Sequence, residues 1–143
     1  MVILQEGDRI ELRLTPDRYV TVRYAGASGD FNPIHIDEDF ARQVGLPGRI
    51  LHGLWTMAQT ARAATEAAGG DPTALLSLGV QFRGMGRMEQ ELMVSGEVKS
   101  VADGVATAKL EVTQGENRLI RNGVAELRTD VAGSSEGSAA QDS

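Results

Sequence analysis

Apolar and polar residues alternate along Gly7–Leu14, as expected of a strand with one buried face. The same two-residue period returns in the second half of the chain, in residues 74–82, 90–101, 104–114 and 118–129. Asp103-Gly104, between two of these segments, is a strong β-hairpin signal. The pattern therefore predicts one strand near the N-terminus and an antiparallel meander of four strands near the C-terminus.

The segment between the first strand and the meander is predicted to be helical. Thr15-Pro16 is typical of a helix start, with Thr15 as N-cap and Pro16 in the first helical position. This helix is predicted to end before Asn32-Pro33, because the residue before a proline avoids the helical conformation. Asp30–His35 is therefore predicted to be a loop.

A second, short helix is predicted over residues 38–45, with Asp37 as its N-cap and a glycine at its end. Phe40, Ala41 and Val44 follow one another at helical spacing in this segment. We expect these three side chains to face inward.

A long helix is predicted over residues 52–70, where apolar residues recur every three or four positions. Because the predicted buried face consists mostly of alanine, this helix can pack closely on a sheet. The residues of that face are Leu54, Met57, Ala58, Ala61, Ala64 and Ala68.

The order of these elements predicts an α+β protein in which one antiparallel sheet wraps around one long central helix. The chain has 143 residues, the length of a single domain, which we place at residues 1–131. Residues 132–143 have no periodicity and almost no apolar residues, so this tail is predicted to be disordered.

Composition excludes several classes of function. The formal net charge is −6 and the basic residues are scattered, which argues against a nucleic-acid partner. Without cysteine, the chain has no disulfide, no thiolate metal site and no cysteine nucleophile. The first residues lack the basic region and the long apolar run of a signal peptide or a membrane span. We expect a cytoplasmic protein that does not contact membranes.

The candidate chemistry lies in "GDFNPIH", Gly29 to His35. A stiff Asn32-Pro33 turn between a carboxylate and an imidazole can direct Asp30 and His35 at one point, as paired acid–base catalysis requires. Taken singly, Asp30 and Asn32 can equally be ordinary turn residues, and His35 a packed or solvent-facing one.

Other chemistry is less well supported. A metal site of His35, Asp37 and Asp39 lacks the spacing of a helical two-histidine motif, and its acidic residues suit a helix N-terminus. A Ser28, His35 and Asp30 triad lacks the strand–turn–helix context of a nucleophile elbow. We therefore expect no metal ion and no cofactor.

His52-Gly53, at the start of the long helix, adds an anion site. A glycine in the first turn leaves its backbone N–H unshielded, so that Gly53 can donate to an oxyanion. Two proton-transfer groups and an oxyanion donor form a coherent catalytic set.

The stretch from Tyr24 to Gly53, "YAGASGDFNPIHIDEDFARQVGLPGRILHG", resembles the signature of the MaoC-like dehydratases, which include (R)-specific enoyl-thioester hydratases and β-hydroxyacyl-ACP dehydratase subunits. A weaker resemblance extends from the first strand to about Leu127. It implies a hotdog fold, and reversible addition of water to a trans-2-enoyl thioester to give the (R)-3-hydroxyacyl product.

Carried over by position, the resemblance makes Asp30 and His35 the dyad that holds a water and moves its protons. Gly53 becomes the oxyanion donor, and Asn32 supports the loop. His52 and Arg83 are also expected to bind the substrate, Arg83 through phosphates of coenzyme A or an acidic carrier protein. Arg83 can equally be an exposed charge at a strand end.

The sequence departs from the family pattern at two places, and two other functions remain open. "RGMGRMEQE", Arg83 to Glu91, replaces a proline-containing segment of many relatives, and Ala61 stands where some hydratases have serine. The alternatives to a hydratase are a non-catalytic acyl-binding subunit of a heteromeric dehydratase and an acyl-thioester hydrolase. Because one sheet around one helix leaves open edges, we expect a homodimer or larger assembly, or else a heterodimer.

Overall fold

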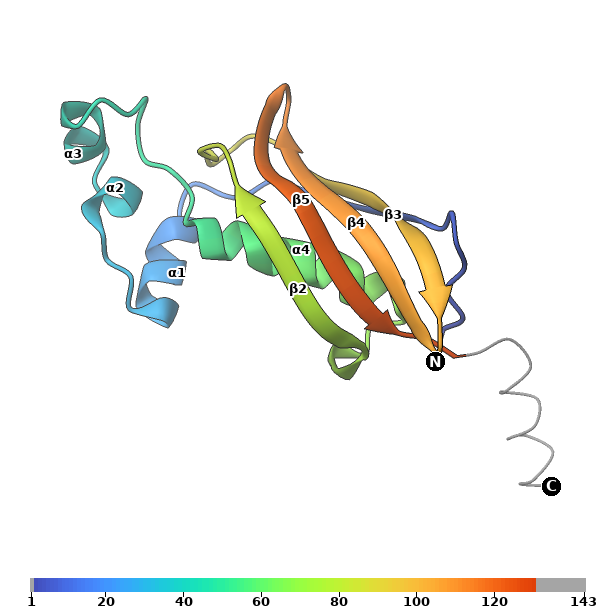
Figure 1. Ribbon diagram of the computed structural model, residues 1–143. Coiled ribbons are helices and arrows are strands. Elements are labelled where there is room, and N and C mark those ends of the chain that lie inside the picture. The colour runs from blue at the N-terminus through green and yellow to red at the C-terminus, as the bar shows by residue number, and fades with distance from the viewer. Residues whose placement is uncertain (1, 131–143) are drawn as a thin grey trace.

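The structure, a computed structural model, describes residues 2–130 and shows five strands and their connecting helices (Figure 1). The predicted tail of residues 132–143 lies outside the described residues. The elements, in chain order, are β1 (Arg9–Leu14), α1 (Val20–Ser28), α2 (Pro33–Ile36), α3 (Glu38–Gln43), α4 (Gly53–Ala67), the 3-10 helix η1 (Pro72–Ala74), β2 (Leu75–Phe82), β3 (Leu92–Ala102), β4 (Val105–Gln114) and β5 (Asn117–Arg128).

All five strands form one antiparallel sheet in the order β1-β3-β4-β5-β2. The predicted four-strand meander is therefore wrong in one respect: β3, β4 and β5 form a meander, but β2 pairs with β5 at the edge of the sheet. Alternation identifies strands but does not tell which neighbour each strand takes.

The hairpin predicted at Asp103-Gly104 is confirmed and joins β3 to β4. Both residues have positive φ, +55° for Asp103 and +76° for Gly104, as a type I′ turn requires. The register runs from Ala102 opposite Val105 to Met93 opposite Thr113. This turn sets which β4 residues face the helix.

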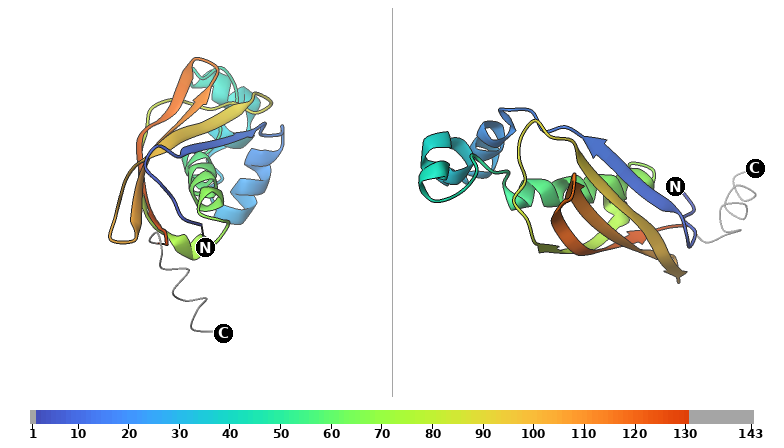
Figure 2. Two further views of the ribbon diagram at one scale, coloured as in Figure 1. Left: turned by 90° about the vertical axis from the view of Figure 1, so that its right-hand side faces the viewer. Right: turned by 90° about the horizontal axis from the view of Figure 1, so that it is seen from above.

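The sheet curls around α4, which lies along its concave face (Figure 2). Inward side chains of β4 alternate with outward ones, so Ala106, Ala108, Leu110 and Val112 are buried. They join a core that includes Ala63 and Ala64 of α4. The predicted α+β class and the sheet-wrapped central helix are confirmed.

The buried face of α4 agrees with the predicted one only at Ala64 and at the C-cap Ala68, which are both buried. Thr56, Thr60, Ala63 and Ala64 are buried, whereas Leu54 is 63% exposed. Thr60 is fully buried because its hydroxyl donates to the Thr56 carbonyl one turn earlier, 3.3 Å away, and so needs no water. The prediction treated threonine as a polar, exposed residue and therefore left Thr56 and Thr60 out of the buried face.

Two other helix predictions are wrong. The first helix does not begin at Thr15-Pro16 but at Val20, because the Pro16 carbonyl accepts from the Glu89 N–H at 2.6 Å and holds this link in an extended form. In α3, only Ala41 of the predicted inward residues is buried, while Phe40 and Val44 are exposed. The predicted Asp37 cap is confirmed, since its Oδ1 accepts from Phe40 N at 3.1 Å.

Among residues 2–130, no helix is long and apolar enough to cross a membrane.

Candidate active site

The candidate residues lie mainly in the segment that connects β1 to α4. Helices α1, α2 and α3 sit together beyond one end of the sheet, beside the N-terminal end of α4 (Figures 1 and 2). Helix α1 ends at Gly29, whose φ of +80° is a left-handed conformation that favours glycine. The chain then turns sharply into Asp30.

His35 lies on a helix, not on the predicted loop. Asn32 caps the short helix α2, since its side-chain oxygen accepts from Ile34 N at 3.3 Å, and Pro33 occupies the first turn. The second half of the predicted Asp30–His35 loop is therefore one helical turn. Asn32 fixes the helix that carries His35.

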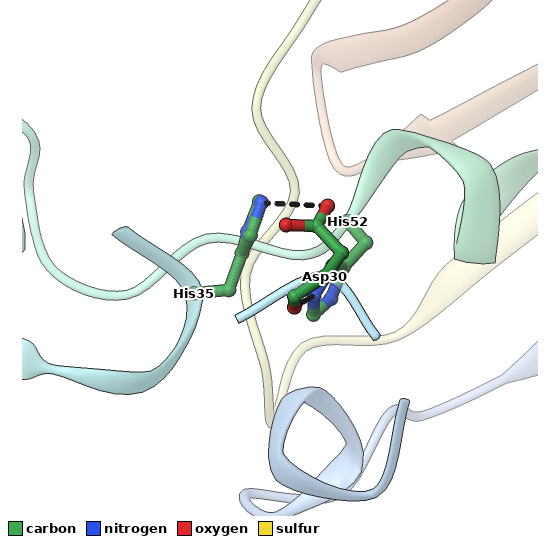
Figure 3. A group of neighbouring side chains, drawn as sticks. All are labelled: Asp30, His35 and His52. Atoms are coloured by element: carbon green, nitrogen blue, oxygen red, sulfur yellow. Dashed lines mark hydrogen bonds and ion pairs between the residues drawn. The ribbon is translucent and has the colours of Figure 1, made fainter. Parts of the chain in front are cut away.

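Asp30 and His35 face each other (Figure 3). His35 is 8% exposed, and its Nδ1 donates to the Ile50 carbonyl at 2.9 Å, which leaves Nε2 as an acceptor in the neutral ring. Nε2 lies 3.9 Å from Asp30 Oδ2. That separation is too long for a direct hydrogen bond, so the two atoms are placed to bind one small polar molecule between them.

Local hydrogen bonds also hold the Asp30 loop. The Asp30 N–H donates to the Ser28 hydroxyl at 3.1 Å, and Asp30 Oδ1 accepts from Asn32 N at 3.2 Å. The second carboxylate oxygen, Oδ2, is left to face His35. Ser28, which could have been a nucleophile, instead donates to the Tyr24 carbonyl.

His52 is buried beneath this pair. Its ring stacks on the His35 ring with centroids 3.8 Å apart and an interplanar angle of 23°, and its Nε2 donates to the Asp30 carbonyl at 3.0 Å. Tyr24 contacts the His52 ring at a centroid distance of 4.7 Å. Burial, more than any other effect, lowers the pKa of His52 and so favours the neutral ring.

Gly53 begins α4 and is exposed. The hydrogen-bond ladder of the helix starts with Thr56 N donating to His52 O, and the Gly53 N–H donates to no described residue. A Cβ added at Gly53 would lie 3.2 Å from two ring atoms of Phe82. The glycine thus offers a free N–H at a helix N-terminus, covered on one side by an aromatic ring.

Arg83 follows Phe82 at the end of β2. Its side chain is exposed and its Nη2 donates to Gln81 Oε1 at 3.1 Å. The structure therefore brings together Asp30, His35 and His52. Gly53 follows His52 in the chain, and Arg83 is one residue from the ring that covers Gly53.

Three contacts of this site were not found from the sequence. The Ile50 carbonyl is a main-chain group, which every residue has, so the residue type does not indicate this contact. Phe82 ends an apolar strand and has the same pattern as a core residue, although it is half exposed. Tyr24 was recognised as a helical residue, but its contact with His52 depends on the turn at Gly29.

Arg49 holds together parts of the segment between β1 and α4. Its guanidinium donates to the Arg18 carbonyl at 2.9 Å and to the Thr21 hydroxyl at 3.3 Å, and it pairs with Glu38 at 3.4 Å. Hydrogen bonds from the Arg49 backbone, the largest cause, lower the pKa of the Glu38 carboxyl. Arg49 thus links α1 to α3 just before Ile50.

One potential ligand atom from each of Asp30, His35 and His52 lies within 4.8 Å of the other two, a spacing that a metal ion could use. Ring nitrogens bind metals in the plane of the ring, and the two rings are stacked face to face. One nitrogen of each ring is engaged by a backbone carbonyl, and His52 Nδ1 is fully buried. This arrangement suits an acid–base pair above a packed ring better than three ligands around an ion.

The chain is similar to known proteins of one family. A protein-family profile described as "MaoC like domain" matches residues 5–118. The chain is 38% identical over 125 residues to the fatty acid synthase subunit beta of Aspergillus oryzae, covering 80% of this chain and 6% of that protein. It is 43% identical over 56 residues to the peroxisomal enoyl-CoA hydratase 2 of Arabidopsis thaliana, covering 38% of this chain and 18% of that protein. The chain thus spans a small part of these relatives.

Solved structures have the same fold. An (R)-hydratase from A. caviae involved in PHA biosynthesis superimposes with a TM-score of 0.80 at 21% identity, over 89% of this chain and 98% of that chain. The ChsH1-ChsH2 complex from Mycobacterium tuberculosis gives a TM-score of 0.79 at 26% identity, over 88% of this chain and 98% of that chain. The predicted hotdog fold is confirmed by these similarities.

Proposed function

Since the chain belongs to the MaoC-like family of hydratases and dehydratases, we propose that it adds water reversibly to a trans-2-enoyl thioester to give the (R)-3-hydroxyacyl thioester. The thioester would be carried by coenzyme A or by an acyl carrier protein. The observation that supports this most directly is the acceptor nitrogen of His35 facing the free carboxylate oxygen of Asp30 across 3.9 Å.

In the hydration direction, Asp30 and His35 hold one water by hydrogen bonds. As the water oxygen forms its bond to C3, the dyad takes a proton from the water, and the C2–C3 double bond becomes a single bond. Electron density moves to the thioester oxygen, which gains enolate character. The dyad then delivers a proton to C2, so water is added without net loss of protons. Dehydration follows the same steps in reverse.

Gly53 would stabilise the enolate-like oxygen. Its N–H has no partner among the described residues and lies at the N-terminus of α4, where the helix dipole favours negative charge. His35 is linked to this helix through the stacked ring of His52, the residue before Gly53. The dyad and the oxyanion donor therefore belong to one connected unit.

The first test is a crotonyl-CoA assay with purified protein. Hydration removes the ultraviolet absorbance of the conjugated enoyl thioester and releases no thiol. Hydrolysis releases free coenzyme A, which a thiol reagent detects, and simple binding changes neither signal. Rapid loss of absorbance without thiol supports the proposal, whereas thiol release favours the hydrolase alternative and no turnover favours the acyl-binding subunit.

The acyl-binding subunit remains the second candidate because one structural neighbour is the two-component ChsH1-ChsH2 complex. Asp30, His35 and Gly53 are all present in this chain, which favours a catalytic role. We also propose that the protein assembles as a dimer through β2. This edge strand carries only uncharged residues, Leu75–Phe82, whereas the opposite edge β1 carries Arg9, Glu11 and Arg13.

A further inference from the structure

One ring nitrogen of His52 is buried without a hydrogen-bond partner. The side chain is 2% exposed, and Nδ1 is the one buried side-chain nitrogen or oxygen among residues 2–130 that has no partner. An apolar side chain would fill the same space without burying a polar atom that water can no longer reach. The rest of the ring must therefore contribute something that an apolar residue cannot.

Both Asp30 and His35 contact the His52 ring (Figure 3). The His52 Nε2–H donates to the main-chain carbonyl of Asp30 at 3.0 Å, and the ring face stacks on His35 at 3.8 Å. The carbonyl belongs to a turn that follows Gly29, at φ +80°, and precedes α2. The bond from His52 thus ties this turn to the start of α4.

We propose that His52 is a positioning residue, which holds the Asp30 loop through Nε2–H and sets the plane of the His35 ring by stacking, without touching the substrate. This inference rests on the proposed function and replaces the expected substrate contact of His52. The Asp30 carbonyl can only accept, so Nε2 must carry a proton, and the buried Nδ1 without a partner then favours the neutral tautomer with Nδ1 bare.

The surroundings keep the ring neutral. Burial lowers the pKa of His52, and the facing groups are the ring of His35, the carbonyl and carboxylate of Asp30, and the ring of Tyr24. A proton on Nδ1 would be buried without an acceptor, and it would place a second positive charge against a protonated His35. His35 can therefore take and release protons while its neighbour does not.

The first experiment measures the tautomer directly and needs no activity. The chain has two histidines, so long-range proton–nitrogen NMR spectra of the full protein contain two ring systems, and His52→Gln identifies which is which. We expect His52 to show a protonated Nε2 and a bare Nδ1, unchanged from pH 8 to pH 6. A ring that titrates near the ordinary value of about 6.5, or that carries its proton on Nδ1, overturns the proposal.

The second experiment separates the two contacts. His52→Phe keeps an aromatic ring against His35 but removes the donor, whereas His52→Gln keeps a donor near the Nε2 position without the ring. With crotonyl-CoA, we expect His52→Phe to lower kcat about 10- to 100-fold, the range seen when a group that orients an active-site residue is lost, with little change in KM. His52→Gln should recover part of that loss, and a Phe variant as active as the wild type would overturn the proposal.

A double-mutant cycle distinguishes positioning from general damage. If His52 acts by placing the Asp30 carboxylate, His52→Phe should cost little further kcat once Asp30→Asn has removed that carboxylate. Losses that multiply in full would show that His52 acts elsewhere. Tyr19→Phe, at an exposed position outside the site, is the control and should leave kcat near wild type. If His52→Phe fails to fold, the NMR titration and His52→Gln still decide.

Discussion

The ring of Phe82 covers Gly53 so closely that an added Cβ would lie 3.2 Å from ring atoms Cδ1 and Cε1. Phe82 ends the edge strand β2 and Gly53 begins α4, so the two elements meet at the Cα of Gly53. Half of the Phe82 surface is exposed, and the ring can move by the few tenths of an ångström that an alanine would need. The effect of adding a side chain at Gly53 and the effect of removing its N–H can therefore be measured with separate variants.

Replacing Gly53 by proline removes the N–H while keeping the helix. Proline is favoured in the first helical position, and His52 already has the extended conformation, φ −65° and ψ 133°, that a following proline requires. We expect Gly53→Pro to lower kcat for crotonyl-CoA about 10²- to 10³-fold, the usual effect of losing one oxyanion donor. Gly53→Ala adds a Cβ but keeps the N–H, and should lose far less. Equal losses in the two variants would mean that crowding of Phe82 matters and the N–H does not.

Asp30→Asn and His35→Ala test the dyad. Each should lower the hydration rate by about 10²- to 10⁴-fold, the range for positioned acid–base groups. In the proposed mechanism the two side chains hold the same water, so the double variant should be little worse than the poorer single one. Circular dichroism melts should show a retained transition for Asp30→Asn, whose side chain is exposed. Normal turnover in both single variants would remove the dyad from the mechanism.

Asn32→Ala tests the cap that holds α2. Loss of the Asn32 oxygen leaves Ile34 N unpaired and should lower the free energy of unfolding by about 0.5–2 kcal/mol, as for other helix caps. His35 lies on the same helical turn, so kcat should also fall. Asn32→Ser keeps a capping oxygen and should restore most of both quantities. An Ala variant with wild-type stability and rate would show that α2 forms without the cap.

Stability should fall on the acid side because of His52. Its pKa is lowered in the folded protein, so between that lowered value and the unfolded value of about 6.5 the unfolded chain binds more protons. The free energy of unfolding therefore falls as the pH drops through about 6.5 and below. Urea unfolding at pH 8 and pH 5.5 should show a larger decrease for the wild type than for His52→Gln. Equal decreases would mean that His52 is protonated as easily in the folded state as in the unfolded chain.

The open edge of β2 should form the dimer contact. Leu76 is 47% exposed on this strand, which has no charged side chain to discourage pairing with another strand. We expect a dimer in sedimentation velocity at micromolar concentration, and a shift toward monomer in Leu76→Lys. Arg13→Ala, on the opposite edge strand, is the control and should leave the dimer intact. A fully active wild-type monomer would contradict this arrangement.

The sequence predicts the strands well because their alternation is local. β3, β4 and β5 and the turn at Asp103-Gly104 follow from neighbouring residues alone. The place of β2 beside β5 is a long-range choice, which the pattern does not contain. The face of α4 was predicted only in part, because Thr56 and Thr60 satisfy their hydroxyls through carbonyls one turn earlier and pack as apolar residues.

At the site, residue types indicated Asp30, His35 and Gly53, since carboxylate, imidazole and a helix-initial glycine each have a known chemical use. The contacts that orient them were not accessible in this way. The Ile50 carbonyl that fixes the His35 tautomer is common to every residue type, and the stack of His52 on His35 depends on how two segments meet. A histidine in a sequence does not show which way its ring lies.

The sheet order also constrains the order in which the fold can form during synthesis. β1, the first of these five strands in the chain, has its partner in β3, Leu92–Ala102, and β2 must wait for β5. Closing contacts between such distant segments is slow, because the chain between them must lose its freedom first. The segment that carries Asp30 and His35 lies between β1 and β3, within the loop that these two strands close. A nascent or truncated chain that ends before β5 would therefore present the segment with the proposed dyad without the complete sheet, and the proposed activity would appear only at the last stage of folding.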